Sequence, residues 1–130
     1  MNWISLLSEG PGVVRDENGI YTNFSSLLYA GHEVESIMIH EIWHLKSKKL
    51  FGDGLSENLK TPEMRKRHEI LCNLFKRAVS SGFELSEHGE SNEFEFFSEI
   101  KLMEKFDKQS LPEYIIDTLK EIGNGHFNQL

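Results

Sequence analysis

Cysteine is almost absent from this sequence, since Cys72 is the only one among its 130 residues. A single cysteine excludes an intrachain disulfide and a zinc site built from four cysteines. Long apolar runs are missing as well, and none approaches the roughly 20 residues that a membrane-spanning helix requires. The segment 1–10 lacks the basic start and apolar stretch of a secretory signal. We therefore expect a cytoplasmic protein with no membrane partner, although export by another route or attachment to a larger polypeptide stays open.

Basic residues are outnumbered by acidic ones, 14 against 21, which gives a formal net charge of −7. That balance argues against general binding of a phosphate backbone, so no nucleic-acid partner is expected. The one basic run, residues 64–68, is interpreted as the solvated face of a helix. The chain is long enough for one core and too short for two, so residues 1–130 are assigned to a single domain. The sequence does not indicate an oligomeric state.

The motif around which the chain is organised is H-E-x-x-H, at residues 40–44. On a helix, His40 and His44 project from one face about one turn apart, so both imidazoles can reach a single Zn²⁺. Glu41, about 100° round the helix, lies beside such an ion. A base for a zinc-activated water is needed in that position.

The segment around this motif is predicted to be a helix from about Glu33 to Phe51. It contains no glycine or proline between residues 34 and 50, and Gly31 and Gly52 provide a start and a stop. Its apolar residues recur at a helical period, and we expect them to pack on the core while the histidine side faces a cleft. These residues are Val34, Met38, Ile42, Trp43 and Leu45.

The remaining pattern predicts an α+β fold that is mainly helical, with a small β-hairpin or sheet packed on the H-E-x-x-H helix. Residues 13–24 are typical of a hairpin turning at Asn18-Gly19, and residues 25–31 are expected to be irregular or a brief turn of helix. A strand edge there can hold an extended peptide, although the hairpin can equally serve only to cover the core. Caps and apolar periodicity predict helices at 3–7, 62–81, 92–107 and 111–122, the last opened by a capping box at Ser110.

A third metal ligand is needed, because two histidines do not make a catalytic zinc site. Glu95 and Glu99 fall in the middle of an apolar stripe on the helix expected at 92–107. A buried carboxylate is normally paired or bound to metal. If Glu95 binds zinc and Glu99 accepts a hydrogen bond from the remaining N–H of a ligand histidine, both carboxylates have a partner. The alternative is an open helix edge with both carboxylates in solvent.

The two strings His40-Glu41-Ile42-Trp43-His44 and Asn92-Glu93-Phe94-Glu95-Phe96-Phe97-Ser98-Glu99 together resemble the catalytic core of the anthrax-lethal-factor type of zinc peptidases. They are also similar to small zincin-like domains of large phage polyproteins, where an E-F-F-[AS]-E string supplies the glutamate. The resemblance covers about residues 19–122, and strong matches are confined to the two strings. It implies a minimal, gluzincin-like zincin domain with Zn²⁺ as cofactor. By this resemblance Glu95 is the third ligand, Glu99 its companion in the second shell and Glu41 the general base.

The same family places a tyrosine seven residues before the ligand glutamate, to stabilise the oxyanion, and this chain has His88 there. A protonated imidazole can donate the same hydrogen bond, which makes activity sensitive to pH. The implied function is hydrolysis of a protein or peptide substrate by metal-activated water, with an endopeptidase expected rather than an exopeptidase. If a phage encodes the chain, the host cytoplasm is its expected location.

Two other functions stay open. One is a zinc-containing module that binds a protein or peptide but has lost turnover, which the replacement of tyrosine by His88, the charge of Lys46 and the small size favour. The other is a structural helical domain in which the H-E-x-x-H string is accidental. Metal content and peptide hydrolysis separate these hypotheses. The other three histidines, His32, His68 and His126, are expected to be exposed to solvent.

Overall fold

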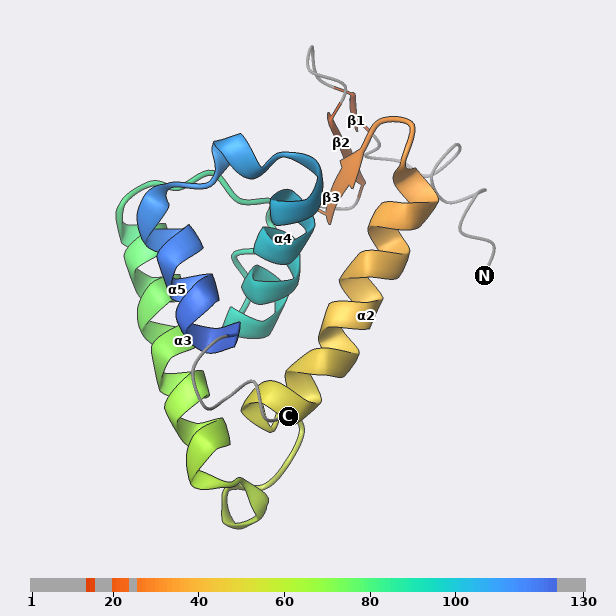
Figure 1. Cartoon of the computed structure of the whole chain (residues 1–130). Coiled ribbons are helices and arrows are strands. Elements are labelled where there is room, and N and C mark those ends of the chain that lie inside the picture. The colour runs from red at the N-terminus through yellow and green to blue at the C-terminus, as the bar shows by residue number, and fades with distance from the viewer. Residues whose placement is uncertain (1–13, 16–19, 24–25, 124–130) are drawn as a thin grey trace.

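The computed structural model describes residues 14–15, 20–23 and 26–123, and helices dominate this part of the chain (Figure 1). Its elements are β1 (Val14–Arg15), β2 (Ile20–Asn23), β3 (Ser26–Tyr29), α2 (Glu33–Phe51), α3 (Pro62–Ser80), α4 (Glu93–Phe106) and α5 (Glu113–Gly123), with 3-10 turns at Glu57–Leu59 and Lys108–Ser110. The prediction of a mainly helical fold is confirmed. The helix expected at 3–7, the Asn18-Gly19 turn and His126 lie outside the described residues. None of the described helices combines the length and the apolar character needed to cross a membrane.

Local capping explains where the long helices begin and end. α2 has the predicted bounds, and it ends because Gly52 adopts a φ of 72°, with its N–H donating to the Lys48 carbonyl at 3.1 Å. α3 begins at Pro62, and the Thr61 hydroxyl accepts a hydrogen bond from the Met64 N–H at 3.2 Å. Short polar residues and glycine therefore define these boundaries, as the sequence predicts.

The last helix begins later than predicted. Ser110 does not form the expected capping box, because its hydroxyl donates to the Asp107 carboxylate at 2.5 Å and the residue belongs to a 3-10 turn. α5 starts at Glu113 instead, and the Pro112 carbonyl accepts hydrogen bonds from the N–H groups of Ile115 and Ile116.

α4 is the central helix of the molecule, with α2 on one side and α3 and α5 on the other (Figure 1). The helices pack around one hydrophobic core, as expected for a single domain of this size. The largest core side chains, each with at most 2% of its surface exposed, are Phe51, Leu71, Phe96, Phe97, Ile100, Ile115 and Ile122.

Three short strands form an antiparallel sheet in the order β1-β2-β3 beside the start of α2 (Figure 1). β3 is the strand next to α2, and the Tyr29 N–H donates to the Ser36 hydroxyl at 3.2 Å. The prediction that residues 25–31 are irregular or helical is therefore wrong for Ser26–Tyr29. The strand is only four residues long, which leaves too little alternation to identify it from the sequence.

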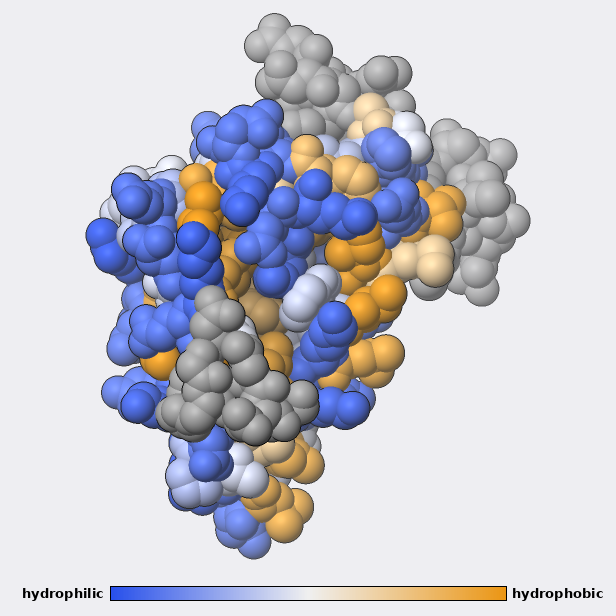
Figure 2. Space-filling model, viewed as in Figure 1, coloured by the Kyte–Doolittle hydropathy of each residue, from blue (hydrophilic) through white to orange (hydrophobic). Residues whose placement is uncertain are grey.

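The expectation about which side of α2 packs is also wrong. Met38 is 50% exposed and Leu45 62% exposed, and Val34 and Ile42 are exposed with them. Hydrophobic residues gather along this outward side of α2 (Figure 2). The buried residues of α2 are Ser36, Ser47 and Phe51, which lie on the same side of the helix as His40.

Trp43, in contrast, packs on the core as predicted, with its ring edge-on against Phe97 of α4 and the ring centroids 5.6 Å apart. The histidine side of α2 is thus the side that meets the core. The basic run 64–68 is likewise not a uniformly solvated face, since Arg67 is 1% exposed and donates to the Leu50 carbonyl at 2.9 Å.

Candidate metal centre

α2 holds the two histidines of the H-E-x-x-H motif close together on its buried side. The Nε2 atoms of His40 and His44 lie 3.0 Å apart, and the ring centroids are separated by 4.7 Å. Both side chains are about a fifth exposed, at 18% and 22%. The one-turn spacing of the motif is sufficient to produce this pairing.

α4 brings Glu95 to the histidine pair from 55 residues further along the chain. Its Oε2 atom lies 2.8 Å from His40 Nε2, and its Oε1 atom lies 3.0 Å from His44 Nε2. Asn92 fixes the first turn of α4, because its side-chain oxygen accepts hydrogen bonds from the N–H groups of Phe94 and Glu95, each at 2.9 Å. The structure therefore brings together the three residues predicted to be metal ligands.

The donor set fits a zinc ion. The two imidazole nitrogens and the Glu95 carboxylate, which meets each nitrogen through a different oxygen, form a donor triangle with contacts of 2.8 to 3.0 Å. Zinc bonds of about 2.0–2.1 Å in a tetrahedron separate neighbouring ligand atoms by about 3.3 Å, so small side-chain movements suffice. Three protein ligands leave a fourth position open, which distinguishes catalytic from structural zinc sites.

The three groups strongly influence each other's charge. Burial alone would raise the pKa of Glu95, but hydrogen bonds from His40 and His44 and the charges of these residues outweigh it, and the pKa lies well below its usual range. The hydrogen bond to Glu95 raises the pKa of His44 against the opposing effect of partial burial. Without a metal the site thus favours an ionised Glu95 and a protonated His44. A metal must displace that proton in order to bind.

A dependence of stability on pH follows from these two shifts. The lowered pKa of Glu95 stabilises the metal-free protein above the ordinary value of 4.5, and this contribution is lost as the pH falls through the lower value in the folded protein. The raised pKa of His44 stabilises it below 6.5, and this contribution is lost as the pH rises through the folded-state value. The pair should therefore stabilise the metal-free chain most between those two pH values.

Urea unfolding in the presence of a chelator measures this effect. We expect His44→Gln to lower the free energy of unfolding more at about pH 5.5 than at about pH 8.5. Zinc affinity should follow the opposite trend and rise with pH, because ligand histidines must be neutral. An equal loss of stability at both pH values would contradict the proposed pairing of His44 with Glu95.

Glu41 lies in the same pocket as the three donors. The pocket has a volume of about 200 Å³ and is also lined by Leu27 and Leu28 of β3. The Glu41 side chain is exposed, and its charge is close enough to His44 to contribute to the raised pKa of that residue. It is therefore placed beside the donor triangle rather than in it, as the motif predicts.

His88 reaches the site from the loop that precedes α4. Its Nε2 atom lies 2.9 Å from Glu95 Oε2, and its ring centroid is 6.0 Å from that of His40. The side chain is 45% exposed and lines the rim of the histidine pocket. The structure thus places this predicted residue in the site, in direct contact with the carboxylate.

No family model, curated protein or solved structure matches this chain.

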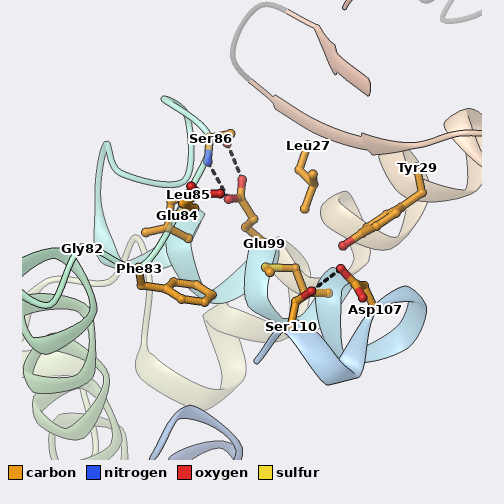
Figure 3. Close-up of a pocket in the computed structure, with 11 residues that line it drawn as sticks. Leu27, Tyr29, Gly82, Phe83, Glu84, Leu85, Ser86, Glu99, Asp107 and Ser110 are labelled. Carbon is orange, nitrogen blue, oxygen red and sulfur yellow. Dashed lines mark hydrogen bonds between the residues drawn. The ribbon is translucent and has the colours of Figure 1, made fainter. Parts of the chain in front are cut away.

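Glu99 does not form the hydrogen bond to a ligand histidine that the sequence predicts. Among the described residues, its carboxylate accepts hydrogen bonds from the Ser86 N–H, at 2.8 Å, and from the Ser86 hydroxyl (Figure 3). The side chain is 2% exposed, and burial raises its pKa despite these bonds. Glu99 consequently fixes the loop that carries His88, and its charge also interacts with His40 and His88.

Gly89 was missed by the sequence analysis, although it lies next to His88 and is buried. Its N–H donates to the Ser86 hydroxyl at 3.0 Å. A Cβ atom added to Gly89 would lie 2.7 Å from the carboxylate atoms of Glu99, so a side chain fits only if that carboxylate, which is hydrogen-bonded to Ser86, or the loop is displaced. Ser86 and Gly89 are polar or small loop residues with no periodic pattern, which is why the sequence does not identify their role.

We expect Gly89→Ala to destabilise the protein by about 1–3 kcal/mol, because the new methyl group overpacks a closed site. Urea unfolding of the metal-free protein measures the change. Gly123→Ala is a matched control, since a Cβ there has no neighbour within 4 Å. Equal stability of Gly89→Ala and Gly123→Ala would show that the loop can relax around the methyl group.

A larger pocket of about 550 Å³ adjoins the histidine pocket, and Leu27 lines both of them. Its walls come from β3, from the loop 82–86 and from α4, with Glu99 and Ser86 on one side and Tyr29 and Asp107 on the other (Figure 3). Tyr29 is 8% exposed and lines this larger pocket. Tyr29 does not line the histidine pocket. His88 does, and it occupies the sequence position that the resemblance assigns to the oxyanion donor.

His68 was expected to be exposed, and this prediction is wrong. It is half-buried between α3 and α4, with its ring stacked on Phe94 at a centroid distance of 5.1 Å and its Nε2 atom 2.6 Å from Glu93 Oε2. His32, in contrast, is exposed as predicted and pairs with Glu35.

Proposed function

We propose that the chain is a zinc-dependent peptidase, acting as an endopeptidase on extended peptide segments. The observation that carries this proposal is the convergence of His40, His44 and Glu95, with Glu41 beside them in an accessible pocket. Two imidazoles, a ligand carboxylate and a separate acid on the H-E-x-x-H helix form the residue set that zinc-assisted hydrolysis requires. The order of sheet, motif helix and glutamate helix is consistent with a minimal zincin-like fold.

The position of β3 supports a peptide as the substrate. β3 pairs with β2 on one side only among the described strands, and its residues Leu27 and Leu28 line the histidine pocket. An extended peptide can bind such an edge by main-chain hydrogen bonds, which places a peptide bond over the pocket. The adjoining pocket beyond Leu27 has room for a substrate side chain.

In the proposed mechanism His40, His44 and Glu95 would hold a zinc ion, which would supply Lewis acidity. Glu41 would accept a proton from the attacking water and later donate it to the leaving amine. Glu95 keeps both histidines oriented towards one point. His88 donates its ring N–H towards the negative charge that develops on the substrate carbonyl oxygen.

A second candidate function is a zinc-containing module that binds a peptide without cleaving it. The contact between His88 Nε2 and Glu95 Oε2, at 2.9 Å, favours this candidate. An N–H engaged by a ligand carboxylate is less available to an oxyanion. The two functions therefore differ in whether His88 is free to turn towards a bound carbonyl group.

The test is cleavage of a mixed-sequence peptide library by the zinc-loaded protein, read as new amino termini. A peptidase should produce them, lose activity with a chelator and regain it with zinc. Zinc binding with peptide capture and no cleavage would support the second function. Failure to bind zinc would contradict both functions.

A further inference from the structure

A second group of metal-binding side chains lies between α3 and α4, apart from the H-E-x-x-H motif. His68 and Cys72 are one turn apart on α3, and Glu93 is the first residue of α4. The His68 Nε2 and Glu93 Oε2 atoms are 2.6 Å apart, and the Cys72 thiol donates to Glu93 Oε2 at 3.4 Å. All three residues are half-buried, and one donor atom from each lies within 4.8 Å of the others.

An ion pair accounts for only part of this arrangement. Glu93 is favourably placed at the positive end of the α4 dipole, and a protonated His68 would pair with it in the absence of any metal. Cys72 adds only a weak hydrogen bond to that pairing, because a thiol is a weak hydrogen-bond donor. Its position facing Glu93, one turn from His68, provides the soft third donor that a transition metal prefers.

The distances also suit a metal of this kind. Zinc binds thiolate sulfur at about 2.3 Å and imidazole nitrogen at about 2.0–2.1 Å, so tetrahedral ligand atoms lie about 3.3–3.6 Å apart. The distance between Cys72 Sγ and Glu93 Oε2 already has this value, at 3.4 Å, and the 2.6 Å contact of His68 with Glu93 needs to widen. Side chains at a partly exposed helix junction can make that adjustment.

This group is separate from the H-E-x-x-H centre. Residues two apart on a helix point about 200° away from each other, so Glu93 and Glu95 face opposite sides of the first turn of α4. Glu95 faces α2 and Glu93 faces α3, in agreement with the central place of α4 (Figure 1). A single ion therefore cannot bind both groups.

We propose that His68, Cys72 and Glu93 form a second binding site, for a divalent transition-metal ion with a preference for zinc. Binding replaces the thiol proton of Cys72, which passes to solvent, by a sulfur–metal bond. Three protein ligands leave one position for water. The ion links α3 to the first turn of α4, and so it restrains the turn from which Glu95 projects. Its role is structural and does not depend on peptidase activity.

Titration with Co²⁺ tests this proposal directly, since Cys72 is the only cysteine of the chain and so the only source of a thiolate ligand. The wild-type protein should bind two ions and develop a thiolate-to-cobalt charge-transfer band in the near ultraviolet. Cys72→Ser should bind one ion and lose the band. His44→Ala should also bind one ion but keep the band, because it disables only the first site.

The other two ligands are tested by the affinity read from the same band. His68→Ala and Glu93→Gln should each weaken cobalt binding at least tenfold, whereas Glu69→Gln, an exposed neighbour of His68, should not. Zinc should raise the Tm of His44→Ala but not that of His44→Ala/Cys72→Ser. Absence of the band in wild type at saturating cobalt, or a band indifferent to both His68→Ala and Glu93→Gln, would overturn the proposal.

Discussion

Glu41→Gln is expected to lower peptide hydrolysis by about 10²- to 10⁴-fold while zinc remains bound at the wild-type stoichiometry. The amide has nearly the same shape as the carboxylate but cannot accept a proton at neutral pH. Zinc binding should be unaffected, because the donor triangle consists of His40, His44 and Glu95 and does not include Glu41. The measurement is kcat/KM on one cleaved peptide, together with zinc content after dialysis.

Glu35→Gln is the matched control for this variant. Glu35 is also an exposed glutamate of α2, but it pairs with His32 at 3.3 Å, away from the donor triangle. Its substitution should change neither activity nor zinc content. Activity that persists in zinc-loaded Glu41→Gln would remove the general base from the proposed mechanism, and a loss of zinc in this variant would mean that Glu41 helps to hold the ion.

Helix boundaries were predictable wherever a short polar side chain or a glycine determines them. Thr61 and Asn92 cap α3 and α4, and Gly52 ends α2, each through local hydrogen bonds encoded within a few residues. Ser110 misled the prediction because Asp107 competes for its hydroxyl. A capping box is recognisable in sequence, and a competing acceptor three residues earlier is an equally local signal.

The meeting of Glu95 with the histidine pair was predictable in part from helix geometry, which left an open helix edge as the alternative, and in part from the resemblance to the zinc peptidases. One-turn spacing places His40 and His44 on a single face, and a carboxylate inside an apolar stripe needs a partner. The loop before α4 follows no such periodicity. For that reason the contacts of Glu99 with Ser86, and the close approach of Gly89, emerged only from the structure.

The apolar stripe of α2 led to a wrong expectation for a physical reason. An amphipathic pattern identifies two faces of a helix but does not identify which face meets the core. Here the histidine side of α2 packs towards α4, and Glu95 of α4 contacts His40. The buried residues on that side include the small Ser36 and Ser47, which allow a close approach. The stripe that includes Met38 and Leu45 is left on the outside of α2.

His68 illustrates the same limit in a second place. Its neighbours in sequence are basic, which favours a solvated face, yet the i and i+4 spacing of His68 and Cys72 repeats the arrangement of His40 and His44. Glu93 lies two residues before Glu95, and α4 carries them to opposite sides. The donor spacing was therefore visible in the sequence, but the packing of α3 against the start of α4 was not.

Glu95→Ala is expected to weaken zinc binding by more than about 100-fold, because loss of an outer-shell partner alone typically costs about 10- to 100-fold. The variant retains the histidine pair, whose Nε2 atoms are 3.0 Å apart, but lacks the only carboxylate in contact with both rings among the described residues. Competition with a chromophoric chelator measures the dissociation constant. The zinc affinity of Glu95→Gln should lie between those of the wild type and Glu95→Ala, since the amide oxygen is a neutral and weaker ligand.

The control for this variant must lie on α4 without contact to the site, and Glu104, which pairs with Lys101, meets that requirement. Glu104→Ala should bind zinc like the wild type. Circular dichroism of the metal-free proteins separates loss of a ligand from loss of the fold, since α4 keeps its Asn92 cap in both variants. Equal, tight zinc binding by wild type and Glu95→Ala would show that Glu95 is not a ligand. The histidine pair would then lack a third protein ligand, and hydrolysis at this site would be unsupported.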